Sequence, residues 1–266
     1  MKLNDILTPS FRRMGRELGL KTEMFEGHLV VIAPMWRRAL SAESQFCRAV
    51  VANGFLTERQ MHRAVWRYRL GATRSGGVIF WQIDQEERIH DGKVMWYRGD
   101  CHRDKTRNPN WVGAMLQGRY RWADHPGTTH CLFGLHLLME DVRGKRADVN
   151  ISIAVVEAEK TAVIMSERYR QCLWMATGGL GGVQAEKFRP LRGRKVILFP
   201  DTDPEGKTYR RWYEAAQEVN RQPWWEGSPP VTVSPILEQH ATEAQKAAKI
   251  DIADLIIMKS EESQRS

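Results

Sequence analysis

Between residues 149 and 258 the chain alternates short apolar runs with longer stretches in which apolar positions recur at helical spacing. The short runs, which have the length and β-branched character of buried strands, are Asn150–Glu157, Cys172–Thr177, Lys195–Asp201 and Val231–Pro235. The helical stretches between and after them are roughly Lys160–Arg170, Gly206–Asn220 and Glu238–Lys249. Strands that alternate with helices predict an α/β fold with a parallel sheet flanked by helices.

The part of the chain before residue 146 has a different pattern, in which helices precede β-rich runs. Thr57 to Gln60 has the form of a capping box, with Thr57 as the N-cap and Gln60 at the third helical position. The box opens a helix that is predicted to end near Tyr68. A second helix is expected over Met35–Ala52, and Leu29–Ile32 favours a strand.

Two β-rich runs, Gly77–Ile83 and Lys93–Arg98, lie on either side of the polar stretch Asp84–Gly92, which ends in Asp-Gly. Runs of this kind around a polar connection predict a β-hairpin. One face of the hairpin is expected to hold Trp81 and Trp96 as core. Together with the helices before it, the hairpin indicates a smaller α+β subdomain.

These patterns divide the chain into three parts. Residues 1–145 form the expected basic α+β subdomain, residues 146–258 the expected parallel-sheet domain, and residues 259–266 a charged tail that is expected to be frayed. A chain of 266 residues is long enough for two such domains.

Composition places the chain among ordinary globular proteins, with 42% hydrophobic and 27% charged residues. Its longest apolar stretch, around Leu29–Ala33, is much shorter than the roughly 20 residues that span a bilayer, and the N-terminus has no apolar signal-peptide core. We therefore expect a cytoplasmic protein without membrane contact. The four cysteines form no C-x-x-C pair, which argues against a zinc ribbon and favours reduced, buried thiols.

Positive charge is concentrated in the first half of the chain. Residues 1–140 hold 21 Lys and Arg against 14 Asp and Glu, whereas residues 141–266 hold 19 against 18. The excess predicts a polyanionic partner for the N-terminal part, although a merely solvated basic surface would give the same count.

The N-terminal candidates for nucleic-acid contact interleave basic and aromatic side chains. Basic groups neutralise phosphates, and aromatic faces stack bases without sequence preference. The candidate residues are Lys93, Arg98, Arg103, Lys105, Arg107 and Trp111. They predict a surface for single-stranded DNA or RNA.

Acidic residues end two of the predicted strands. Glu157 closes the first strand, and Asp201 follows the third, with Asp203 two positions further on. Acids at the carboxyl ends of parallel strands converge in the crevice where open α/β sheets bind ligands. Because carboxylates in one place repel one another, a hard divalent cation, Mg²⁺ or Mn²⁺, is the expected cofactor.

The segments Val155–Ala162 and Phe199–Gly206 together resemble the Toprim domain of primases and topoisomerases, which has a Glu after one strand and Asp-x-Asp after a later one. Ile250–Leu255 resembles the Asp-x-x-Asp segment that follows in bacterial and phage primases. The resemblance implies a Toprim-type sheet. The residues to which it assigns catalysis or metal binding are Glu157, Asp201, Asp203 and, for the metal alone, Asp251.

Further segments extend the resemblance over about residues 70–257. Those that resemble successive parts of the primase catalytic core are Gly77–Asp84, Gly92–Arg98, Asn108–Trp111 and Cys131–Leu138. In that family this region is a small basic subdomain that guides single-stranded template to the Toprim domain. The chain resembles in particular the primase-like Toprim proteins that mobile elements carry.

The chain departs from the family pattern at three places. Glu157 is followed by Ala158 instead of Gly, Thr161 stands where an acid is often found, and the cysteine pattern of the zinc module is missing. These departures bear on priming activity more than on metal binding.

Each candidate site residue also has a structural alternative. Glu157 would suit a helix N-terminus, and Asp201 would suit a solvated position in the turn after its strand. Asp203 would suit an N-cap of the helix that follows, and Asp251 a helix cap or the surface. Lys160 is a candidate phosphate contact or a solvated lysine, and Glu159 is expected to be a surface charge.

Three functions follow from these residues. The first is primase-like nucleotidyl transfer from nucleoside triphosphates on a single-stranded template, with a replicative helicase or a separate zinc-module protein as a candidate partner. The second is a Toprim nuclease, which would use the same acids to hydrolyse phosphodiesters. The third is a non-catalytic nucleic-acid-binding or replication accessory module.

Overall fold

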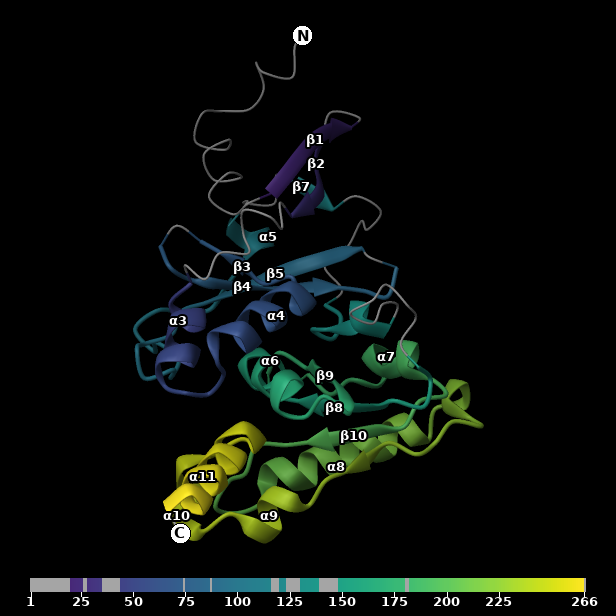
Figure 1. Ribbon diagram of the computed structural model, residues 1–266. Coiled ribbons are helices and arrows are strands. Elements are labelled where there is room, and N and C mark those ends of the chain that lie inside the picture. Colours follow the sequence, from purple (N-terminus) through teal and green to yellow (C-terminus); the bar gives the residue numbers. More distant parts are fainter. Residues whose placement is uncertain are drawn as a thin grey trace. The chain divides into compact units, whose positions relative to one another are not determined.

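The computed structural model describes residues 20–25, 28–34, 44–73, 75–86, 88–115, 120–122, 130–138, 148–179 and 182–265. The chain divides into two units, Met1–Cys131 and Leu132–Ser266, and both contain β-sheet (Figure 1). Within the described ranges, no helix has both the length and the apolar character needed to cross a membrane.

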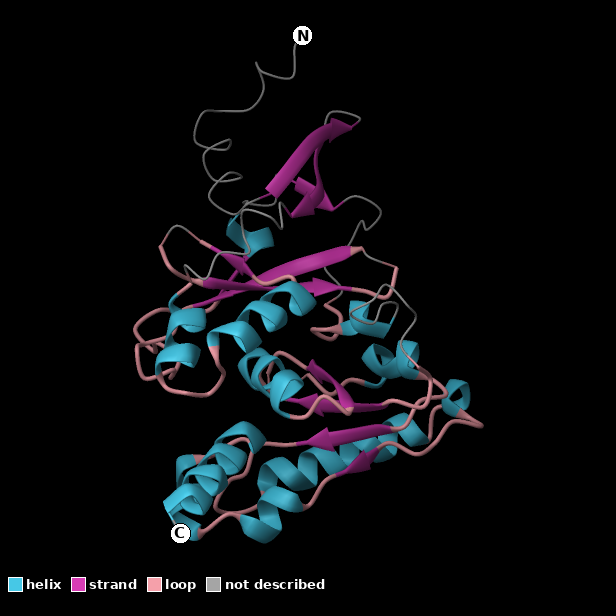
Figure 2. Cartoon of the chain, viewed as in Figure 1, coloured by secondary structure: helices cyan, strands magenta, loops and turns pink. Residues whose placement is uncertain are grey.

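The second unit is built on a four-stranded parallel sheet. Its strands are β8 (Ser152–Val156), β9 (Cys172–Ala176), β10 (Val196–Phe199) and β11 (Thr232–Val233). The order across the sheet is β11-β10-β8-β9, and each neighbouring pair is parallel. The four strands fall in the four predicted apolar runs, so the predicted α/β fold class is confirmed (Figure 2).

Strand β8 lies inside this sheet, which explains its uninterrupted apolar character. Ile153–Val156 are completely buried. A parallel strand that is covered on both faces loses the alternation of polar and apolar positions. Helix α6 (Glu159–Arg168) packs on β8 and β9, and helix α8 (Lys207–Asn220) packs against β11.

Short helical segments and one longer helix complete the described part of the second unit. They are η2 (Leu135–Leu138), α7 (Ala185–Phe188), η3 (Arg189–Leu191), η4 (Pro223–Trp225), α9 (Ile236–His240), α10 (Glu243–Ala248) and α11 (Ile252–Arg265). Helix α11 continues to Arg265, through the segment that was expected to be a frayed tail.

The single helix expected over Glu238–Lys249 is two helices, α9 and α10. Ala241 between them is extended, and Thr242 begins α10 as its N-cap. The Thr242 hydroxyl accepts a hydrogen bond from the N–H of Gln245 at 3.3 Å, and the Gln245 side chain accepts one from the N–H of Thr242 at 2.8 Å. This capping box starts a new helix although helix-forming residues continue across the break.

In the first unit, helix α4 (Glu58–Tyr68) begins at the predicted capping box. The Thr57 hydroxyl accepts from the N–H of Gln60 at 3.3 Å, and the Gln60 side chain accepts from the N–H of Thr57 at 2.9 Å. Helix α3 (Gln45–Ala52) covers the end of the helix expected from Met35, and residues 35–43 lie outside the described residues.

The described residues of the first unit form two sheets. The strands of the three-stranded sheet, ordered β1-β2-β7, are β1 (Leu20–Phe25), β2 (His28–Pro34) and β7 (Tyr120–Trp122). The strands of the antiparallel sheet, ordered β3-β4-β5-β6, are β3 (Gly71–Ala72), β4 (Val78–Ile83), β5 (Ile89–Met95) and β6 (Asn110–Trp111). The strand expected over Leu29–Ile32 lies within β2, and helix α5 (Val112–Met115) follows β6.

The predicted hairpin consists of β4 and β5, but its second strand begins earlier than expected. Asp91 and Gly92 lie inside β5, where Gly92 is paired with Trp81. The turn is formed instead around Asp84, whose N–H donates to the carbonyl of Arg88 at 3.0 Å. A side chain at position 92 would place its Cβ 2.7 Å from the Trp81 ring, so Gly92 is required by packing and not by a turn.

Candidate functional site

The two strands that end in acids are neighbours in the sheet of the second unit. In the parallel pair of β8 and β10, Val156 is in register with Phe199. Glu157 and Asp201 follow these positions, so both leave the sheet at the same edge, at the carboxyl ends of the strands. The N–H of Gly178, just beyond β9, donates to the carbonyl of Glu157 at 3.0 Å and ties the third strand end to this edge.

Asp201 lies among charges that disfavour its ionisation. Burial raises the pKa of Asp201 well above its ordinary value, and the negative charges of Asp251 and Glu157 raise it further. The positive charge of Lys160 opposes these effects, and Asp254 adds to them. The carboxyl groups are therefore close enough to Asp201 to act on it electrostatically.

This edge of the sheet has the donor chemistry of a hard-cation site. A divalent cation would relieve the repulsion on Asp201, and Mg²⁺ prefers carboxylate oxygens. No group of three or more His, Cys, Asp or Glu side chains in the described ranges lies in an arrangement that would hold a metal ion. Glu157 and Asp201 nevertheless supply oxygen donors of the kind that Mg²⁺ prefers.

Asp203 binds the N-terminus of helix α8, whose N-cap residue is Gly206. Its Oδ1 accepts hydrogen bonds from the N–H groups of Glu205 at 3.0 Å and Lys207 at 3.1 Å, and its Oδ2 accepts one from the N–H of Thr208 at 2.7 Å. Burial would raise the pKa of Asp203, but these bonds hold it well below its usual range. Both carboxylate oxygens therefore serve the helix N-terminus, as in the structural alternative, although the helix begins at Lys207 and Asp203 is not its N-cap residue.

We expect Asp203→Ala to lower the free energy of unfolding by about 1–2 kcal/mol, as the loss of an N-cap does. Because the pKa of Asp203 is lowered in the folded state, its stabilisation is present above the ordinary value of 3.8 and is lost as pH falls toward the folded pKa. Urea denaturation of both proteins at neutral and at acid pH measures this. A stability difference that stayed constant into acid would contradict the capping role.

Asp251 and Asp254 form the N-terminal cap of helix α11. The N–H of Asp254 donates to Asp251 Oδ1 at 2.9 Å, and the N–H of Asp251 donates to Asp254 Oδ2 at 3.2 Å. The hydroxyl of Thr161 donates to Asp251 Oδ2 at 2.5 Å. The Asp-x-x-Asp segment is thus a helix cap in this fold. Thr161, which stands where an acid is often found, binds this cap through Asp251.

Lys160 lies against the same pair of acids. Its Nζ is 3.6 Å from Asp251 Oδ2 and 3.8 Å from Asp254 Oδ1. Glu159, which was expected to be a surface charge, is buried. The expectation was wrong because α6 begins at Glu159, only a short step after the end of β8 at Val156, so that the first turn of the helix already packs on the sheet.

The basic segment of the first unit lies between β5 and β6, and aspartates of the same segment pair with two of its arginines. Arg98 Nη2 is 2.6 Å from Asp100 Oδ2. Arg107 Nε is 3.9 Å from Asp104 Oδ2, and its guanidinium lies over the Trp96 ring, 5.5 Å from the centroid. These two arginines have less charge to offer a phosphate than the sequence suggested.

All four basic residues of this segment are exposed, but Arg103 and Lys105, unlike Arg98 and Arg107, take part in no ion pair within the described part of the chain. Lys93 lies on β5, half-buried and in register with Trp111. The predicted nucleic-acid residues of the first unit therefore share one region but differ in how their charges are compensated, whereas Lys160 lies on α6 in the second unit.

Trp111 packs on His130. The ring centroids are 4.2 Å apart with planes tilted by 40°, and His130 Nδ1 is 2.7 Å from Gln82 Oε1. The half-buried Trp111 is thus oriented by the protein itself. This arrangement fits a fixed stacking platform and also a peripheral part of the core.

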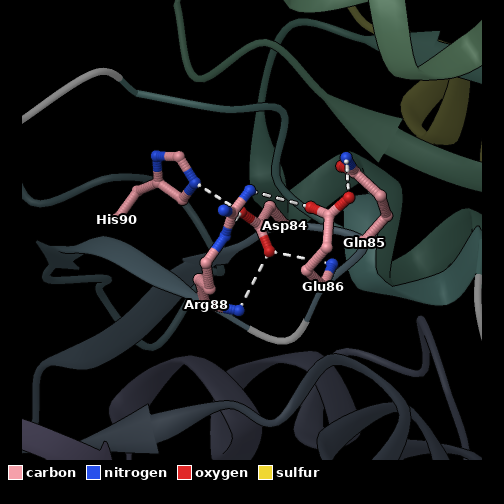
Figure 3. A network of polar contacts seen from close by, with 5 residues as sticks. All are labelled: Asp84, Gln85, Glu86, Arg88 and His90. Atoms are coloured by element: carbon pink, nitrogen blue, oxygen red, sulfur yellow. Dashed lines mark hydrogen bonds and ion pairs between the residues drawn. The ribbon is translucent and has the colours of Figure 1, made fainter. Parts of the chain in front are cut away.

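A polar network at the hairpin turn was not singled out from the sequence (Figure 3). Asp84 Oδ2 lies 3.0 Å from His90 Nε2 and accepts from Arg88 Nε at 2.7 Å, while Oδ1 accepts from the N–H groups of Glu86 and Arg88 at 2.9 Å each. Burial opposes ionisation, yet the bonds from His90 and Arg88 keep the pKa of Asp84 below its ordinary value. An Asp at the start of a turn was the available signal, because its carboxylate commonly bonds the backbone that follows.

Comparison with known proteins gives one family and a distant structural likeness. A family model described as "Domain of unknown function (DUF6371)" matches residues 44–202. No curated protein matches the chain. Among solved structures, the chain is similar to the primase fragment of the bacteriophage T7 primase-helicase protein, with 17% sequence identity and a TM-score of 0.43 over 70% of this chain and 68% of that chain.

Proposed function

We propose that this chain, which belongs to the family described as a domain of unknown function (DUF6371), is a Toprim-like enzyme that transfers nucleotidyl groups on a single-stranded template. The observation that carries the proposal is the position of Glu157 and Asp201 at the carboxyl ends of adjacent parallel strands. Ligands of open α/β sheets bind at such an edge. Nucleotidyl transfer needs phosphate charge neutralised and the attacking oxygen positioned, which an acidic edge that recruits cations can provide.

Glu157 and Asp201 would hold the Mg²⁺ or Mn²⁺ of this enzyme, and the bound cation would neutralise phosphate charge. The neighbouring acids help to hold the chain at this edge of the sheet in place. Asp203 fixes the start of α8, and the N–H of Thr202 donates to the carbonyl of Ile250 at 3.1 Å, next to the cap of α11. The segment around Asp201 is therefore held from both sides, which limits its movement when charge builds up.

The first unit would bind the template. Arg103 and Lys105 are exposed and suited to phosphates, and the oriented ring of Trp111 is suited to stacking a base. Nucleoside triphosphates would be the second substrate, and a helicase or zinc-module protein remains a candidate partner for template delivery.

A second candidate is a nucleic-acid-binding module without catalysis. The specific observation in its favour is that Asp203 and Asp251 already accept hydrogen bonds from helix N-termini. Thr161 also places a hydroxyl, and not a further carboxylate, beside Asp251. Fewer carboxylates are then open to a cation than in a full acidic cluster.

One assay separates these functions. The purified protein is incubated with Mg²⁺ or Mn²⁺, single-stranded DNA or RNA and labelled nucleoside triphosphates, and the products are resolved on a sequencing gel. New labelled oligonucleotides would support nucleotidyl transfer, and a shortened template would show a nuclease instead. Template that is bound but unchanged in both metals would select the non-catalytic module.

A further inference from the structure

Lys160 is a half-buried cation placed between two carboxylates. Its side chain is 16% exposed, and its Nζ lies 3.6 Å from Asp251 Oδ2 and 3.8 Å from Asp254 Oδ1. The Asp251 side chain is only 8% exposed. Ion pairs with so little solvent around them are screened much less than surface pairs. The ammonium of Lys160 therefore offsets the negative charge of the two carboxylates more strongly than it would at the surface.

The two acids are fixed in place by the fold. Asp251 and Asp254 exchange backbone hydrogen bonds as the cap of α11, and Thr161 donates to the same Asp251 oxygen that Lys160 approaches. Neither acid can move away from the other without breaking the helix cap. Two carboxylates held together in this way need a positive charge nearby.

The cluster adjoins the acidic edge of the sheet. The carbonyl of Ile250, directly before Asp251, accepts from the N–H of Thr202, directly after Asp201. The positive charge of Lys160 beside Asp251 must therefore affect the binding of a cation at Asp201.

We propose that Lys160 is a built-in counter-ion of Asp251 and Asp254, and that it competes with divalent cations for these carboxylates, confining metal binding to Glu157 and Asp201. The inference rests on the proposed metal site but not on nucleotidyl transfer. Lys160 is thus a positioning residue for the metal. It neutralises the α11 cap when no divalent cation is bound.

The experiment measures Mn²⁺ binding by calorimetric titration and thermal unfolding of the full chain in chelator and in Mn²⁺, without nucleic acid. Lys160→Met should bind Mn²⁺ about tenfold more tightly than wild type or more, because a repelling charge is lost from beside the site. In chelator its melting temperature should fall by about 2–4 °C or more. Mn²⁺ should restore most of that loss, whereas Lys160→Arg should stay close to wild type in both measurements.

Lys246 provides a matched control. Its Nζ also lies 3.6 Å from a carboxylate oxygen and its side chain is 18% exposed, but its partner, Glu243, is 87% exposed. Lys246→Met should leave Mn²⁺ affinity unchanged. If it raised affinity as much as Lys160→Met, a general charge effect would replace the proposed local one.

A double variant keeps the test decisive if Lys160→Met folds poorly. In Lys160→Met/Asp254→Asn one carboxylate charge is removed with the ammonium, so stability in chelator should recover and the gain in Mn²⁺ affinity should disappear. Persistence of the gain, or wild-type Mn²⁺ affinity in a folded Lys160→Met, would overturn the proposal. No template is used in this test. A gain in Mn²⁺ affinity in a protein that transfers no nucleotides would therefore support the proposed role of Lys160 and contradict only the proposed nucleotidyl transfer.

Discussion

Asp201→Asn is expected to abolish nucleotidyl transfer and, in the absence of divalent cations, to raise the melting temperature. The loss of turnover follows from the removal of one of the two carboxylates that would hold the metal. Metal-ion stabilisation of phosphoryl charge is worth several kcal/mol, so the rate should fall by about a hundredfold or more. The gain in stability follows from the electrostatics of the site.

The stability effect has a defined dependence on pH. Burial and the carboxylates of Asp251 and Glu157 raise the pKa of Asp201 in the folded state above the ordinary value of 3.8. Between the unfolded and the folded pKa the folded state binds more protons, so its stability falls as pH rises through this window. The asparagine variant lacks this penalty, and its advantage should vanish at pH below 3.8.

Thermal unfolding in chelator at several pH values measures the difference, and Glu186→Gln is a suitable control. Glu186 lies in the same unit, but its side chain is 70% exposed and its carboxylate is 3.6 Å from Arg189. Removing that surface charge should change neither turnover nor the pH profile. An Asp201→Asn protein with wild-type activity would take Asp201 out of the mechanism.

The features that could be predicted from the sequence are those that neighbouring residues determine. The run Ile153–Val156 is apolar at four consecutive positions. An inner parallel strand, which is buried on both faces, accounts for such a run directly. The capping box of Thr57 and Gln60 needs only residues three apart, and it formed where predicted. The shared edge of Glu157 and Asp201 followed from strand parallelism alone.

The features that were missed depend on contacts between distant segments. Asp91-Gly92 has the composition of a turn, but the glycine is needed because Trp81 on the partner strand covers it. Thr161 and Asp251 are 90 positions apart, so nothing near either residue shows that a hydroxyl meets the α11 cap. For the same reason the partners of Lys160 could not be read from its own helix.

The positive charge available for nucleic acid also depends on which basic residues pair with acids, and not only on how many basic residues there are. The segment from Arg98 to Arg107 contains four basic residues and two aspartates, Asp100 and Asp104. Both aspartates pair with arginines of the segment. The phosphate contacts are therefore expected to come mainly from Arg103 and Lys105.

Arg103→Ala/Lys105→Ala is expected to weaken single-stranded DNA binding roughly tenfold or more at low salt and to flatten its salt dependence. Each lost phosphate contact lowers the slope of log affinity against log salt by about 0.7 for single strands, so two lost contacts should lower it by about 1.4. The measurement is a salt titration of the anisotropy of a labelled oligonucleotide for wild type and variant.

Arg98→Ala/Arg107→Ala is the charge-matched control, because it also removes two positive charges from this segment. Asp100 and Asp104 already offset these arginines, so the slope should change by clearly less than in the first variant. Equal changes in both variants would show that only the net charge of the segment matters. No change in either would place the nucleic acid elsewhere. The proposed enzyme would then lose its template site, whereas the proposed metal site at Glu157 and Asp201 would be unaffected.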